Sequence, residues 1–180
     1  WIDGKIPQLK ELENIVFVPD FTTLVINGVK ILFIGGAVSI DRKYRKEYNL
    51  GYWENEGFPT IDYDIANMLN DMRDIDIVVT HTSPSWTYPV AFNDLVHSYA
   101  KNDPKLYMDL RIERDKVDSV YDNLIFDNDI KFWFYGHFHA SHSELNGGIT
   151  YNLLSINEFH DFDERRIVKE KEDNTLNSEK

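Results

Sequence analysis

The stretch KFWFYGHFHA, residues 131–140, decides the fold. Its first five residues are mostly aromatic, which is typical of a β-strand covered on both faces. Two histidines, His137 and His139, follow directly after this strand. Residues two apart on an extended backbone point to the same side, so we expect both imidazoles on one side. They are either satisfied core side chains or ligands.

Two earlier segments end in a similar way. LFIGGA (32–37) is an apolar run that ends in glycine, and VVTH (78–81) is one that ends in His81. In α/β sheets, ligands gather at the carboxyl ends of the strands. If these ends share one edge with the end of the 131–137 strand, they form one site. Three imidazoles there could hold Zn, Mn, Fe, Co or Ni.

Two hairpins complete the predicted sheet. In TTLVINGVKILFIGG (22–36), Asn27-Gly28 supplies the two positive φ angles of a tight turn between β-branched runs. The segment SELNGGITYNLLSI (143–156) predicts a second hairpin that turns at residues 146–148. The sequence therefore predicts a mixed α/β protein with strands at both ends of the chain.

Helices are expected between the strands. Apolar residues at helical spacing follow a candidate cap at Thr60, and they recur in 91–100 and in a long segment from about 103 to 125. We interpret the charged residues of that long segment as a solvated face. Residues 37–59 have no sustained period and predict an ordered, functional loop.

Composition bounds the function. The chain has 180 residues and a net charge of −12, which disfavours binding to the phosphate backbone of nucleic acids. It has no cysteine, so thiolate metal sites are excluded. No apolar run is long enough to span a membrane, and we expect a cytoplasmic protein. Residues 159–180 are strongly charged and predict a frayed tail.

Three motifs together, GHFHASH, VVTHTSP and LFIGGAVSIDRKYR, resemble the C-terminal half of the calcineurin-like metallophosphoesterases of bacterial and phage type. The resemblance covers about residues 24–155. It implies an α/β fold in which a two-layer β-sandwich is flanked by helices. Residues 1–158 would then be the C-terminal part of a single metallophosphoesterase domain.

The resemblance also implies a site and a reaction. His81 and His137 would ligate one metal ion and His139 a second, with Mn²⁺ as the first choice and Fe, Zn or Ni as other suitable ions. Two such cations clamp a phosphate and convert water to hydroxide near neutral pH. The implied activity is metal-dependent hydrolysis of phosphate mono- or diesters.

Asp41 and Arg42 are candidates for substrate binding. They lie in the SIDR stretch that follows the 32–37 segment. Arginine offers a bidentate fork to a phosphate. An ion pair within the loop, or a turn cap, would use the same residues without any ligand.

The sequence departs from the family in its first half. The motifs Asp-x-His, Gly-Asp-x-x-Asp and Gly-Asn-His-Asp/Glu do not occur, and no histidine precedes His81. In the family these motifs supply the remaining ligands and the general-acid histidine. We therefore expect an N-terminal half of the site outside this sequence, as a separate chain, a cleaved piece or a deletion.

Two other interpretations stay open. One is a phosphoesterase-like scaffold that binds a partner and has lost the chemistry. The other is a single-metal enzyme of the carbonic anhydrase or cupin kind, in which three histidines hold one ion with an open position. The helices expected between His81 and His137 disfavour the second, because those folds are mainly β.

Overall fold

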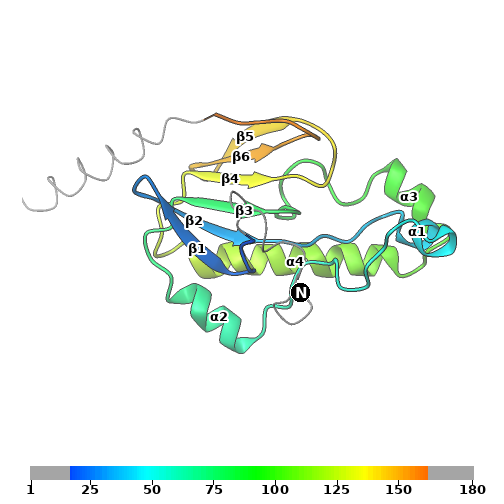
Figure 1. Cartoon of the computed structure of the whole chain (residues 1–180), viewed down its shortest axis with the longest axis horizontal. Helices are drawn as coiled ribbons and strands as arrows, with labels where there is room; N and C mark the ends of the chain where they lie inside the picture. The colour runs from blue at the N-terminus through cyan, green and yellow to red at the C-terminus, as the bar shows by residue number, and fades with distance from the viewer. Residues whose placement is uncertain (1–16, 162–180) are drawn as a thin grey trace, which may run out of the picture.

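The computed structural model describes residues 17–161, which form a mixed α/β protein with one six-stranded sheet (Figure 1). The strands are β1 (Thr22–Ile26), β2 (Val29–Ile34), β3 (Ile77–Thr80), β4 (Phe132–Tyr135), β5 (His142–Asn146) and β6 (Ile149–Leu153). The helices are α1 (Arg42–Tyr48), α2 (Tyr63–Asn70), α3 (Asp94–Ala100) and α4 (Leu106–Leu124). Within the described residues, no helix combines the length and apolar character that crossing a membrane requires.

The sheet has a parallel centre and antiparallel edges. Its strand order is β1-β2-β3-β4-β6-β5, and the four central strands β2, β3, β4 and β6 run parallel. The edge strands β1 and β5 are the first arms of the two hairpins. The carboxyl ends of β2, β3 and β4 consequently lie side by side on one edge of the sheet, which is the arrangement that the sequence analysis required for a single site.

Both predicted hairpins are confirmed. The first turns at Asn27 and Gly28, with φ of 51° and 82°. The second turns at Gly147 and Gly148, with φ of 58° and 86°. Two consecutive positive φ angles match the right-handed twist of the flanking strands, so these turns fix the register of both edge strands.

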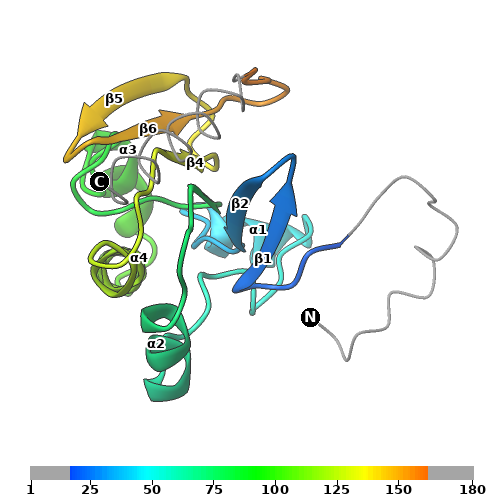
Figure 2. The same cartoon turned by 90° about the vertical axis from the view of Figure 1, so that its left-hand side faces the viewer.

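Helices α2 and α4 cover one face of the sheet (Figure 2). Val117, Val120 and Leu124 of α4 are fully buried and belong to one core cluster with Trp133 and Tyr151 of the sheet. Burial of this kind stabilises the fold by roughly 1.5–3 kcal/mol for each large apolar side chain. The cluster fixes the long helix under the strands whose ends carry the histidines.

One expectation for the long helix is wrong. Glu113 and Arg114 lie on its buried side, and they are only 3% and 4% exposed. The sequence favoured a solvated face because charged residues are rarely fully buried without partners. Here both have partners, described below.

Helix starts and the long loop also differ from expectation. Helix α2 begins after Asp62 rather than Thr60, because the Asp62 carboxylate accepts from the Ile65 N–H at 2.9 Å. Helix α3 is capped by Asn93, and α4 begins at Leu106. The loop 37–59 contains α1, none of whose residues is buried. It has no apolar stripe, so its helical period was not visible in the sequence.

Two expectations are not settled by the described residues. The described residues form a single six-stranded sheet, so the predicted two-layer β-sandwich stays a prediction. The charged tail 159–180 lies outside the described residues except for its first three positions.

Candidate functional site

His81 and the GHFHA turn (residues 136–140) meet where two neighbouring parallel strands end. His81 follows β3 and Gly136 follows β4, and the Gly136 N–H donates to the His81 carbonyl at 3.3 Å. A Cβ on Gly136 would lie 3.9 Å from the His81 Nδ1. The imidazole rings of His81 and His137 contact each other edge to face, with their centroids 5.1 Å apart.

The expectation that His137 and His139 lie on an extended backbone is wrong. β4 ends at Tyr135, and His137 and His139 have φ of 67° and 51°. Non-glycine residues in this region are strained and cluster at functional sites. The turn is anchored by Phe138, which packs against the main core cluster and against the Tyr135 ring. The imidazole of His137 reaches His81 through this anchored turn.

The environment keeps the two contacting imidazoles neutral. Desolvation, followed by the charge of His81, lowers the pKa of His137 to about 4, although a hydrogen bond with the Val38 backbone opposes this shift. Desolvation and nearby His139 lower the pKa of His81, against the opposing charge of Glu56. At pH 7 both rings are therefore in the neutral form that binds metal ions.

The stability of the metal-free protein should consequently fall on acidification. Below pH 6.5 an unfolded chain protonates its histidine, whereas folded His137 stays neutral down to about pH 4. The unfolded state then binds more protons, so the free energy of unfolding rises with pH across this window. The loss should reach at most about 3 kcal/mol.

This slope is measured by urea unfolding in a chelator between pH 7 and pH 5, above the range where exposed carboxylates titrate. The variant His137→Asn should have a visibly flatter dependence on pH. An unchanged slope in this variant would show that His137 does not cause it.

A cleft of about 550 Å³ opens beside His81. Its walls are the ends of β2 and β3, the segment 53–57 and Asp20. Gly36, with φ of +85°, allows the segment 53–57 to approach, because a Cβ there would lie only 2.4 Å from the Gly57 carbonyl oxygen. The Asp20 carboxylate accepts from the Gly35 N–H at 2.6 Å and is fixed at the same edge.

Glu56 is a site residue that sequence reasoning missed. It lines the cleft together with His81, and its charge raises the pKa of that histidine. Among residues 17–161, its buried Oε1 finds no hydrogen-bond partner. A carboxylate oxygen with spare acceptor capacity beside an imidazole suits a cation or a polar ligand. Its position in an irregular loop gave no signal in the sequence.

No protein-family model and no curated protein matches this chain.

The donors present fit a metal ion in part. The structure brings His81 and His137 into contact and places His139 within electrostatic range of both. Within the part of the chain that the structure describes, no three side chains of His, Asp or Glu are grouped as a metal site. The assignment of His81, His137 and His139 as metal ligands stays a prediction.

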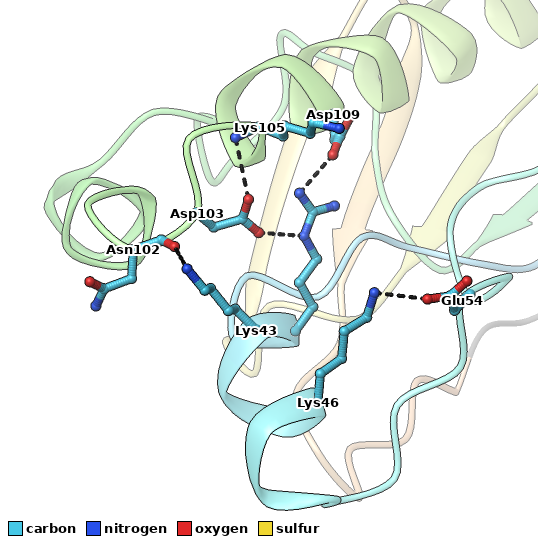
Figure 3. Close-up of polar contacts among 8 residues, drawn as sticks. Lys43, Lys46, Glu54, Asn102, Asp103, Lys105 and Asp109 are labelled. Atoms are coloured by element: carbon cyan, nitrogen blue, oxygen red, sulfur yellow. Dashed lines mark hydrogen bonds and ion pairs between the residues drawn. The ribbon is translucent and has the colours of Figure 1, made fainter.

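Asp41 and Arg42 both form ion pairs within the protein, and Figure 3 shows Asp103 and Asp109, two of the carboxylates involved. Arg42 pairs through Nε with Asp103 and through Nη2 with Asp109, both at 2.6 Å, and it lowers the pKa of Asp103. Asp41 pairs with Arg45 at 2.9 Å. The two ion pairs of Arg42 tie α1 to the start of α4, whereas the Asp41–Arg45 pair lies within α1 and its N-cap. Arg42 also lines a cavity of about 180 Å³ that shares Glu56 with the cleft, and its substrate role stays a prediction.

Glu113 of α4 fixes the loop between β2 and α2 through hydrogen bonds. Its Oε2 accepts from the Val38 N–H at 2.5 Å, and the Phe58 backbone also hydrogen-bonds to this carboxylate. Desolvation nevertheless raises its pKa. One buried carboxylate thus holds both ends of the segment that borders the cleft.

Proposed function

We propose that this chain carries the histidine part of a metal-dependent phosphoesterase site that hydrolyses phosphate mono- or diesters with two divalent cations. The observation that carries the proposal is the contact between His81 and His137, whose rings lie 5.1 Å apart at the ends of two adjacent parallel strands. Neutral imidazoles at such a sheet edge are suited to hold a cation rather than to fill a core.

Each group has an assigned role. His81 and His137 hold one ion, and His139 reaches a second, with Mn²⁺ as the preferred metal. The ions, when bound, would supply the positive charge that polarises the phosphate and lowers the pKa of a water molecule. The carboxylates of Asp20 and Glu56 line the cleft and favour cations there. The remaining ligands and the general acid are assigned to the segment that the resemblance places outside this sequence.

The proposed substrate is a phosphorylated small molecule or protein in the cytoplasm. A net charge of −12 disfavours polynucleotides, since the phosphate backbone would be repelled. Bound cations would reverse the sign of the field locally and admit a single phosphate group.

Metal uptake is the decisive test, because it needs only this chain. Mn²⁺ titrated into the protein should bind, and His137→Ala should weaken binding at least tenfold, about 1.4 kcal/mol, because one of the two contacting imidazoles is lost. His97→Ala is the matched control, since His97 lies in α3 and contacts Tyr107 instead. Isothermal titration calorimetry measures both affinities.

Activity is tested with an aryl phosphate monoester and diester in the presence of Mn²⁺. Hydrolysis that survives a chelator, or replacement of His137 and His139, would remove the proposal. Absence of any metal uptake would favour the other candidate, a phosphoesterase-like binding module without catalysis.

A further inference from the structure

Arg114 of α4 holds the segment that follows His81. Its guanidinium is buried and donates through Nη1 to the carbonyls of Ser83 and Pro84, at 2.6 and 3.0 Å, and to the Ser83 hydroxyl. Through Nη2 it donates to the Pro89 carbonyl at 3.0 Å. These acceptors all lie in the loop 81–90, so one side chain joins the two ends of this loop. Asp118 and Glu144 also accept from the loop, through the N–H groups of Ser85 and Tyr88.

The same guanidinium contacts the GHFHA turn. Its carbon lies 4.9 Å from the centre of the Phe138 ring, in a cation–π arrangement. Phe138 stands between His137 and His139 and is partly buried against the core. Arg114 therefore touches, on one side, the loop that begins at His81 and, on the other, the residue that anchors the two histidines of the turn.

Lysine could not make this set of contacts. A guanidinium is planar, offers five N–H donors in a fixed fork and stacks on aromatic rings, whereas an ammonium is a point charge. The neighbouring Glu113 holds a third segment at Val38. Two consecutive residues of one rigid helix thus connect the loops after β2, β3 and β4.

We propose that Arg114 is a positioning residue of the site: its hydrogen bonds to the loop 81–90 and its stacking on Phe138 set the separation of the His81 and His137 imidazoles. Its consequence for metal binding rests on the proposed function. The coupling of the loop 81–90 to the GHFHA turn through Arg114 does not rest on the proposed function.

The coupling is tested by amide hydrogen exchange on the full chain, followed in peptides that span 81–90 and 136–142. Arg114→Lys should speed exchange at least tenfold in both. Arg111→Lys is the matched control, because Arg111 is exposed on the same helix, and it should change neither. Faster exchange in 81–90 alone, or in neither, overturns the proposal.

A second variant keeps the test decisive if Arg114→Lys does not fold. Phe138→Leu retains the hydrogen bonds of Arg114 and removes the stacking. It should speed exchange in 136–142 by at least tenfold and in 81–90 by a smaller factor. Unchanged exchange in 81–90 overturns the coupling.

Metal affinity separates this inference from the proposed function. Arg114→Lys should weaken Mn²⁺ binding at least tenfold, and Arg111→Lys should not change it. If the unmodified chain binds no Mn²⁺, the proposed function fails while hydrogen exchange still decides the role of Arg114. If the chain binds Mn²⁺ and Arg114→Lys binds it equally well, positioning of the imidazoles by Arg114 is overturned.

Discussion

Trp133→Ala should lower the free energy of unfolding by about 3–5 kcal/mol, the range found when a large core aromatic side chain is removed. Trp133 is 0% exposed at the centre of the sheet and stacks on Tyr151. Its indole N–H also donates to the Thr80 hydroxyl at 2.9 Å, one residue before His81. Urea unfolding followed by circular dichroism measures the change.

Two variants control this prediction. Trp53→Ala removes a tryptophan that is 66% exposed, so the stability should stay within about 0.5 kcal/mol. Trp133→Phe keeps much of the apolar volume and leaves the Thr80 hydroxyl without its donor, so it should cost less than the alanine variant. A similar loss for Trp133→Ala and Trp53→Ala would contradict the placement of Trp133 in the core.

Glu113→Ala should cost about 3 kcal/mol or more. The Val38 N–H would lose its buried acceptor, and the neighbouring Arg114 would lose the adjacent opposite charge. A buried donor without a partner, and a buried charge without its counterion, are each expensive. Thermal and urea unfolding report the loss.

The position of the replaced carboxylate is what matters. Asp115→Ala removes an exposed carboxylate two residues further along α4 and should be nearly neutral. Glu113→Gln keeps one acceptor oxygen for Val38 and should lie between the two. Equal free energies of unfolding for Glu113→Ala and Asp115→Ala would show that Glu113 does not stabilise the loop between β2 and α2.

The sheet could be predicted from the sequence because its signals are local. Alternating or continuous apolar runs marked the strands, and Asn27-Gly28 and Gly147-Gly148 marked the hairpin turns. The strand order was not predicted, since parallel neighbours are joined by long crossovers and their pairing leaves no local signal. The adjacency of His81 and Gly136 was an inference from strand ends, and the hydrogen bond between their backbones agrees with it.

The residues that hold the site's loops in place, outside the strands, could not be predicted in the same way. Glu113 and Arg114 look like ordinary surface charges, because the hydrogen-bond partners that hold them lie 25–75 positions away in the chain. Helix α1 has no apolar stripe and is held by ion pairs of Arg42 with Asp103 and Asp109. Such long-range polar contacts leave no periodic pattern in the sequence.

The anchored Phe138 has a consequence for the entropy of ligand binding. A histidine on a free loop loses backbone and side-chain freedom when it captures an ion, at roughly 1–2 kcal/mol for each backbone residue that becomes fixed. In the GHFHA turn, the folded core has already immobilised the residue between His137 and His139. Folding therefore fixes the backbone of Phe138 before any ligand binds, which lowers the ordering cost of binding at either neighbouring histidine.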